Sequence, residues 1–257
     1  MKCEYLIQHS LCSKKINLFF IPFFLLIIFS AEVQAQMFSV GGEPGRSDIP
    51  GAAIYLGLEP ADFNYTGGDL PNSTNEERFE FDGSLLRLRL ETRSLQFFLA
   101  TGGSVTGIDD ISYFDVGVQA GYRFSILRNE NLTILLPIQF VSSLTSVNSD
   151  QSVSSAIEFR QGALAAGAGG FIGVRASNNI RLQADFIPYY GFSFATGGTF
   201  GGSLAKLDGK FRLFFDRVFG DYGLSAGYNY KFNRFDVDEN EFDYDLQSHS
   251  ILLGITF

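Results

Sequence analysis

The chain has 257 residues, of which 28 are Asp or Glu and 19 are Lys or Arg, so its formal net charge is −9. Binding to the phosphate backbone of DNA or RNA needs a basic face, so this acidic balance argues against nucleic acid as a partner. Phe and Gly occur 28 times each and cysteine only twice, a composition typical of a β protein built without disulfides.

Residues 1–35 have the pattern of a cleaved secretory signal peptide. Two lysines precede an apolar run at 16–29, which Ser30 ends, and a small-x-small site follows at 33–35. The run is shorter than the roughly 20 residues that a spanning helix needs, and an uncleaved anchor is the alternative. Cys3 and Cys12 both lie in this segment. We therefore expect an exported chain with no thiol to form a disulfide, bind a metal or act as a nucleophile.

Cleavage after Ala35 removes three Lys and two Glu, which leaves a net charge of −10. Residues 36–50 carry Gly and Pro and are expected to form a periplasmic lead-in. From residue 51 to 257 no apolar stretch approaches 18 residues, so a membrane location would have to be reached without helices.

Alternation of apolar and polar residues recurs from Gly51 to the end, in segments of roughly ten residues. In 85–91, Leu86, Leu88 and Leu90 share one face, and Arg87, Arg89 and Glu91 share the other. The same pattern recurs at 113–124, 180–190, 207–215 and 222–233. We expect ten strands in all, each with one oily and one polar face.

Such alternation does not by itself say which face points outward. The expected connections, however, alternate in length around the series. Long ones fall at 60–78, 102–112, 143–157, 191–203 and 236–241, and short ones at 93–94, 128–131, 177–179 and 219–223. An even number of strands with long loops on one side and short turns on the other is the plan of an outer-membrane barrel. Aromatic residues near the strand ends, such as Phe114, Tyr122 and Tyr190, agree with interfacial girdles.

The last residues of the chain alternate in the same way, with Ile251, Leu253, Ile255 and Phe257 on one face. This ending resembles the assembly signal of small bacterial outer-membrane β-barrels of the OmpA/porin-like class. The resemblance implies an all-β, antiparallel up-and-down transmembrane barrel over 51–257, with about ten strands and eight as the runner-up. It also implies outer-membrane lipids, lipopolysaccharide and the barrel-assembly machinery as partners.

If the oily faces meet lipid, the polar faces line the lumen. The expected lumen residues are Arg87, Arg89, Glu91, Asp115, Arg123, Arg175, Arg181, Asp185, Lys206, Asp208, Lys210, Arg212 and Lys231, with Asp216 beside them. Charged groups in a narrow lumen must be paired or wetted, so they form either a plug or a thin channel. A ten-stranded barrel is little wider than the eight-stranded kind that side chains fill. We therefore expect a structural barrel or a narrow pore, with a preference for small anions if it conducts.

Two other functions use the same architecture. A binding or adhesion protein would act through acidic residues on the long-loop side, which are Asp62, Asp69, Glu76, Glu77, Asp109 and Asp110. A soluble barrel that carries apolar ligands would need the oily faces inward. A weak cation site is conceivable at Asp236, Asp238, Glu239, Glu241 and Asp243, although this segment lacks the Gly at position six and the Glu at position twelve of an EF-hand loop.

No catalytic or cofactor motif is complete. Residues 167–173 miss the G-x-G-x-x-G spacing of a nucleotide-binding loop. Past the signal peptide His249 is the sole histidine, and its pattern resembles the H-x-S pairing of lipid-modifying barrel hydrolases only superficially. Its neighbours Ser248 and Ser250 point to the opposite face of the strand. We expect His249 to face outward, no cofactor and no enzymatic activity.

Overall fold

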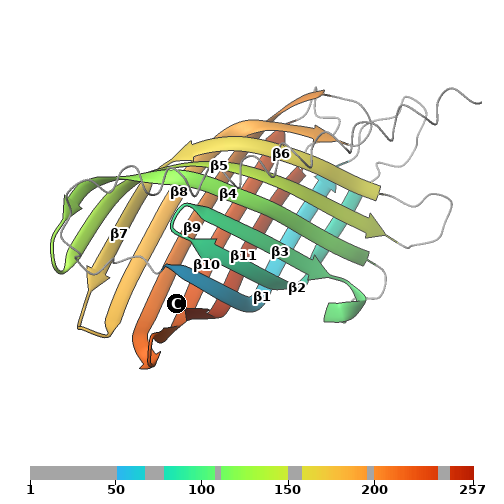
Figure 1. The fold of residues 1–257 in the computed structure, drawn as a ribbon. Coiled ribbons are helices and arrows are strands. Elements are labelled where there is room, and N and C mark those ends of the chain that lie inside the picture. The colour runs from blue at the N-terminus through green and yellow to red at the C-terminus, as the bar shows by residue number, and fades with distance from the viewer. Residues whose placement is uncertain (1–50, 67–77, 108–110, 150–157, 196–199, 237–243) are drawn as a thin grey trace, which may run out of the picture. The chain divides into compact units, whose positions relative to one another are not determined.

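The computed structural model describes residues 51–66, 78–107, 111–149, 158–195, 200–236 and 244–257 (Figure 1). The predicted signal peptide (1–35) and lead-in (36–50) lie outside these residues. In this part of the chain the only helix is the single 3-10 turn η1 (Ser104–Thr106). None of the described helical structure has the length and hydropathy needed to cross a bilayer.

Strands make up almost all of the described chain. They are β1 (Ala52–Thr66), β2 (Arg78–Thr92), β3 (Leu95–Gly102), β4 (Ile111–Arg128), β5 (Leu132–Ser149), β6 (Glu158–Ala168), β7 (Gly170–Arg175), β8 (Ile180–Ala195), β9 (Phe200–Phe219), β10 (Tyr222–Asp236) and β11 (Tyr244–Thr256). Every pairing between them is antiparallel.

β6 and β7 occupy one position in the sheet, because both pair with β5 on one side and with β8 on the other. The break falls at Gly169, whose N–H donates to the carbonyl of Pro137 at 3.1 Å. A Cβ at this position would collide with the carbonyl of Phe186. Glycine therefore allows the break between β6 and β7 while both segments stay paired with β5 and β8.

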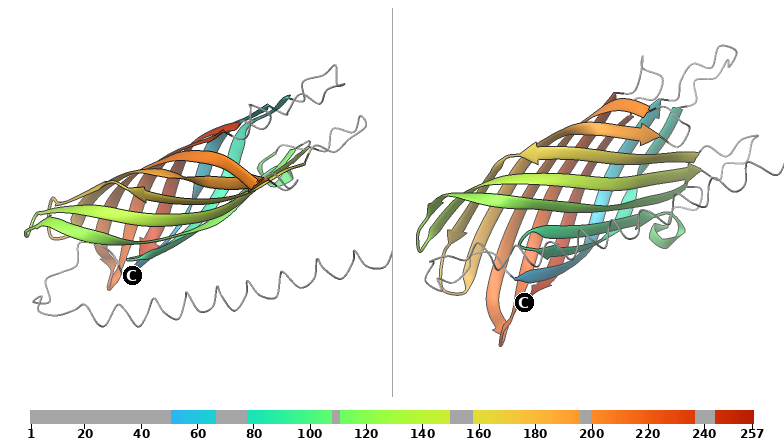
Figure 2. Two further views of the ribbon diagram at one scale, coloured as in Figure 1. Left: turned by 90° about the horizontal axis from the view of Figure 1, so that it is seen from above. Right: turned by 45° about the horizontal axis from the view of Figure 1, so that its top comes forward.

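The sheet closes on itself. β1 pairs with β2 and also with β11, and each remaining strand pairs with its neighbours in chain order. With β6 and β7 counted as one position, the ring has ten strands. Figures 1 and 2 show the barrel from three sides. The predicted antiparallel up-and-down barrel is confirmed, with ten strands rather than eight.

The short predicted turns all lie at one end of the barrel, here called the turn end. They span 93–94, 129–131, 176–179 and 220–221. Gly220 has φ 65°, in the left-handed region that a tight hairpin turn needs. At the other end, here called the loop end, lie η1 and the strand ends that border residues 67–77, 108–110, 150–157, 196–199 and 237–243, which the structure does not describe.

Several strands reach further toward the loop end than the sequence predicts. Residues 143–149, predicted as loop, belong to β5, and 191–195 and 200–203 belong to β8 and β9. Ser and Gly are abundant there and were interpreted as loop signals. In the barrel these residues pair with strands on both sides, as 143–148 do with β4 and β6. Ladder hydrogen bonds outweigh weak local propensity.

Over most of the barrel height the oily faces point outward and the polar faces inward. Leu253 is 68% exposed on the outer surface, whereas Arg87 and Arg181 are 3% and 6% exposed. The parity is the same along the whole of β1, where Ile54, Leu56 and Leu58 face outward. This is the opposite of a soluble barrel, in which the apolar face forms the core.

Near the loop end this polarity reverses along individual strands. On β11 near the loop end, polar Gln247 faces outward and apolar Leu246 is buried inside. Further toward the turn end, apolar Leu253 faces outward and polar Ser250 is buried inside. On β1, exposed Asp62 and buried Phe63 lie at the loop end, followed toward the turn end by exposed Leu58. The loop end therefore has the apolar inside and polar outside of a protein in water.

The inward apolar residues at the loop end form one cluster, here called the apolar layer. It contains Ala61, Phe63, Leu85, Phe98, Ala100, Tyr113, Val141, Val147, Ala163, Ala165, Ile187, Tyr189, Leu204, Phe235, Tyr244 and Leu246. The expectation that charged side chains fill most of the lumen is therefore wrong for this half. Charge is concentrated in the middle and toward the turn end, because an aqueous extension needs a hydrophobic core of its own.

Candidate functional site: a charged network inside the barrel

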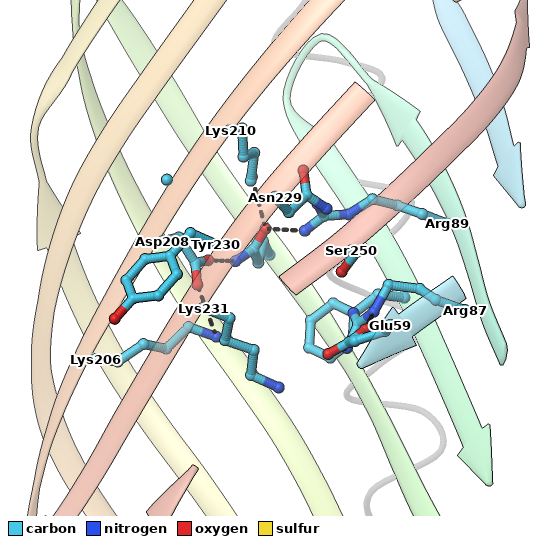
Figure 3. A pocket seen from close by; sticks show the side chains of 13 residues that line it. Glu59, Arg87, Arg89, Lys206, Asp208, Lys210, Asn229, Tyr230, Lys231 and Ser250 are labelled. Atoms are coloured by element: carbon cyan, nitrogen blue, oxygen red, sulfur yellow. Dashed lines mark hydrogen bonds and ion pairs between the residues drawn. The ribbon is translucent and has the colours of Figure 1, made fainter. Parts of the chain in front are cut away.

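The predicted lumen residues converge on the interior below the apolar layer. Those with buried side chains are Arg87, Arg89, Asp115, Arg181, Lys206, Asp208, Lys210, Arg212 and Lys231. Glu91, Arg123, Arg175, Asp185 and Asp216 are half-buried. In Figure 3, Arg87 and Arg89 enter from one side of the lumen, and Lys206 and Asp208 lie on the other.

Asp115 is the best enclosed carboxylate of this network, at 0% exposure. Its Oδ2 accepts from Lys231 Nζ at 2.7 Å and from Arg87 Nη2 at 3.4 Å. Its Oδ1 accepts from the hydroxyl of Thr145 at 3.1 Å. One buried anion thus holds two buried cations, with the remaining oxygen satisfied by a neutral donor, as a buried ion cluster requires.

Glu59 is a member of the network that the sequence analysis missed. It is 1% exposed, pairs with both Nε and Nη2 of Arg87, and accepts from the hydroxyl of Ser248 at 2.6 Å. The signal was present, because Ile54, Leu56 and Leu58 face outward and odd-numbered residues of this strand must then face inward. β1 continues through Pro60 to Thr66, although the sequence predicts a long connection that begins at residue 60. The interior thus contains six carboxylates rather than five.

Gln119 links the acidic and basic parts of the network. Its Nε2 donates to Asp208 Oδ2 at 2.6 Å, and its Oε1 accepts from Lys210 at 3.2 Å and from Arg89 at 3.3 Å. Lys210 also donates to Gln96 Oε1 at 2.8 Å. The amide dipole is therefore oriented with its oxygen toward two cations and its nitrogen toward an anion, which stabilises both.

A second set of ion pairs lies nearer the turn end. Glu91 Oε1 accepts a hydrogen bond from Arg212 Nη2 at 3.2 Å and lies 3.3 Å from Arg89 Nε. Arg123 Nη2 lies 3.8 Å from Asp185 Oδ2. Glu91 therefore joins two strands' arginines across the lumen.

Arg181 and Asp216 form a bidentate ion pair near the turn end. Nε and Nη2 of Arg181 each lie 2.5 Å from a carboxylate oxygen of Asp216. The guanidinium also lies over the ring of Phe214, 4.9 Å from its centroid. Such a fork-shaped pair holds both side chains in one orientation.

The network meets the apolar layer at the ring of Phe98. Arg87 lies 5.4 Å from the ring centroid, and Lys206 and Lys231 each lie 5.7 Å from it. An aromatic face attracts cations through its quadrupole. Phe98 thereby adds favourable contacts for three cations while its body remains part of the apolar layer.

Two small cavities lie among these side chains. One cavity, here called the network cavity, measures about 20 Å³ and is lined among others by Arg87, Arg89, Lys206, Lys210 and Lys231. A second, the turn-side cavity, measures about 30 Å³ and is lined among others by Glu91, Arg123, Asp185 and Arg212. A cavity needs roughly 10–15 Å³ to hold one water, so each has room for only one or two small occupants.

His249 lies on the outer face of the barrel. Its Nδ1 is 2.6 Å from the hydroxyl of Tyr228, and its Nε2 is 3.3 Å from Gln247 Nε2. Ser248 and Ser250 are buried on the opposite face. Neither serine is among the hydrogen-bond partners of His249.

The remaining candidates divide between surface and undescribed residues. Ile251, Leu253, Ile255 and Phe257 are all exposed on the outer face, and recognition of these residues by an assembly machinery stays a prediction. Glu239, Glu241 and the other residues between Asp236 and Tyr244 lie outside the described residues, as do Asp69, Glu76, Glu77, Asp109 and Asp110. Asp62 is described and exposed. Across the described ranges, no group of three or more His, Cys, Asp or Glu side chains could hold a metal ion.

Comparison with known proteins adds little to this geometry. No protein-family model matches the chain, and no curated protein matches its sequence. Among solved structures, the outer membrane protease OmpT from Escherichia coli is similar over 85% of this chain and 100% of its own, with 11% identity and a TM-score of 0.46. The translocator domain of the autotransporter NalP from Neisseria meningitidis matches over 89% and 96%, with 11% identity and a TM-score of 0.34. Neisserial surface protein A matches over 79% and 96%, with 12% identity and a TM-score of 0.26.

Proposed function

We propose that this protein is an integral β-barrel of a bacterial outer membrane with a structural role and a lumen that does not conduct ions. The reversal of polarity along β1 and β11 supports the membrane location. A band of exposed leucine, isoleucine and aromatic side chains suits acyl chains, whereas the polar exterior of the loop end suits water. Only helices and closed barrels satisfy all backbone groups inside a bilayer.

The orientation in the membrane follows from the lengths of the connections. Short turns face the periplasm and long loops face the exterior in barrels of this kind. The loop end is therefore extracellular, and the chain ends next to β1 at the periplasmic side, where the N–H of Phe257 donates to the carbonyl of Ala52 at 3.0 Å. Tyr222 and Phe257, with ring centroids 6.5 Å apart, belong to the aromatic girdle on that side.

The packed lumen is the observation that carries the structural role. A solute would have to pass the apolar layer and then the charged network, whose two cavities measure about 20 and 30 Å³. Wide aqueous channels are formed by barrels of about 16–18 strands. A ten-stranded ring filled by paired charges and aromatic rings is suited to stability rather than to flux.

The test combines two measurements on one refolded preparation. The protein should require detergent to stay in solution and should migrate differently on gels before and after heating. The same preparation, added to planar lipid bilayers, should produce no discrete conductance steps. Stable steps from heat-modifiable protein would overturn the closed lumen, and solubility without detergent would overturn the membrane location.

A narrow pore for small anions is the second candidate. The interior has nine basic residues against six acidic ones, and rings of Arg and Lys favour anions in pores. If conductance steps do appear, we expect them to prefer anions. For adhesion through acidic loops, Asp62 is described and exposed, and the other proposed residues lie outside the described part of the chain.

A further inference from the structure

Lys210 is a buried cation without a carboxylate partner in the described structure. Its side chain is 7% exposed, and its ammonium donates to the amide oxygens of Gln96 and Gln119 at 2.8 and 3.2 Å. No ion pair joins it to an Asp or Glu among the residues that the structure describes. An ammonium has three N–H donors, so two neutral acceptors leave one donor unused. Asp185, the residue opposite Lys210 on β8, and Glu91 are nearby carboxylates, but neither makes a direct ion pair with it in the described structure.

Lys210 also lines the network cavity, and the lining of this cavity is strongly basic. Five cations line it, namely Arg87, Arg89, Lys206, Lys210 and Lys231, against the two anions Glu59 and Asp208. Asp115 pairs with Arg87 and Lys231, and Glu91 pairs with Arg89 and with Arg212. Over the whole interior, the nine basic residues still outnumber the six acidic ones. Buried charge of one sign is expensive unless an opposite charge is close.

A second N–H donor without a hydrogen bond belongs to another residue that lines the network cavity. Nε of Arg89 lies out of solvent and makes no hydrogen bond in the described structure, although Glu91 is within ion-pair distance. Arg89 and Lys210 both reach Gln119 Oε1, so their cationic groups lie side by side. Figure 3 shows the two side chains approaching the same region of the cavity from different strands.

The size of the cavity restricts the occupant. A cavity of about 20 Å³ is small, so it suits one or two small occupants. A monatomic anion fits such a space better than a polyatomic one such as sulfate or gluconate. A water molecule would fill the volume but would leave the excess charge in place.

We propose that the network cavity is a binding site for one monatomic halide ion of the size of chloride, held by Lys210 and Arg89 and stabilised by the field of Lys206 and Lys231. The site is built into the lumen, and one bound anion reduces its excess of positive charge. It goes beyond the proposed structural role and does not depend on conduction or on the membrane location. Its tests are therefore made on barrels in detergent micelles.

The first experiment is thermal unfolding of the purified protein in micelles, with chloride replacing gluconate at constant ionic strength. The midpoint should rise with chloride and reach saturation, because a ligand that binds only the folded state stabilises it by mass action. Bromide should act similarly. Equal midpoints in chloride and gluconate would overturn the site.

The second experiment locates the ion directly. Crystals grown with bromide should show an anomalous peak next to Lys210 Nζ in the network cavity. Peaks confined to the outer surface, or a cavity peak without any halide effect on unfolding, would mean binding at crystal concentration only and would overturn the proposal.

Variants connect the effect to these residues. Lys210→Met should abolish the dependence of the midpoint on chloride, and Arg89→Met should weaken it. Arg181→Gln is the matched control, because Arg181 is equally buried but pairs with Asp216 at the turn end, and its response to chloride should equal that of the parent protein. An unchanged response in Lys210→Met would contradict the proposal. If that variant does not fold, the bromide peak in the unaltered protein decides.

Discussion

Lys231 on β10 and Asp115 on β4 form an ion pair across the full width of the barrel, with Nζ 2.7 Å from Oδ2. In the ring of ten strands these two strands are five positions apart in either direction, which is the largest separation possible. Lys210 on β9 and Gln96 on β3 are related in the same way. The interior is therefore held together by contacts between opposite walls as well as by the ladder between neighbours.

The cross-lumen pair should contribute strongly to stability. In Asp115→Ala the ammonium of Lys231 and the guanidinium of Arg87 remain buried without their shared anion. Breaking a buried pair from one side typically destabilises by about 3–5 kcal/mol, and we expect a loss of this size in the free energy of unfolding. Urea unfolding of the refolded barrel in detergent measures it.

The control for this prediction is Asp221→Ala. Asp221 is an exposed carboxylate in the turn between β9 and β10, and surface changes of this kind usually stay within about 0.5 kcal/mol. Similar urea midpoints for the two variants would mean that the buried pair contributes nothing.

The apolar layer should behave as a true hydrophobic core. Phe235 is buried and stacks on Tyr244 with ring centroids 3.9 Å apart. Phe235→Ala leaves a cavity, and such changes cost about 3–5 kcal/mol. Phe140→Ala, which removes a ring 63% exposed on the outer face, should cost clearly less in detergent. A loss for Phe140→Ala as large as that for Phe235→Ala would contradict a packed loop end.

The outer band provides a direct test of lipid contact. Leu253→Arg places a charge in the middle of the apolar band, and Arg at the midplane of a membrane barrel costs about 2–4 kcal/mol. We expect a lower folded fraction in lipid vesicles, measured by heat-modifiable gel migration. Asp62→Arg, which is outward but at the polar loop end, should fold like the parent. Equal folding of both variants would show that Leu253 does not face acyl chains.

His249 should have no role in hydrolysis. Its ring contacts Tyr228 and Gln247 on the outer face, while Ser248 and Ser250 point into the lumen, so neither of these two serines is placed for proton transfer to His249. His249→Ala should leave phospholipid and ester hydrolysis by the purified protein at the background rate of the parent. Turnover by the parent that the variant loses would reveal an enzyme.

Some of the interior could be read from the sequence because period-two alternation assigns each residue to a face. Once the oily face is known to point outward, Arg87, Lys210 and Lys231 must point inward. Glu59 obeys the same parity, although the predicted lumen residues do not include it. The strand extension at 143–149 was missed because the stability of a Ser-rich strand comes from its neighbours, which local propensity does not describe.

Strand alternation and the spacing of turns determine a ten-stranded sheet with one oily and one charged face, since both are local properties of consecutive residues. The pairings across the lumen, the reversal of polarity at the loop end and the contacts of Lys210 with two amide oxygens were decided only by closure of the ring. Closure brings side chains more than a hundred residues apart to within hydrogen-bond distance, as with Lys210 and Gln96. Which cation meets which anion depends on register and strand stagger around the whole ring, and no local pattern contains that information.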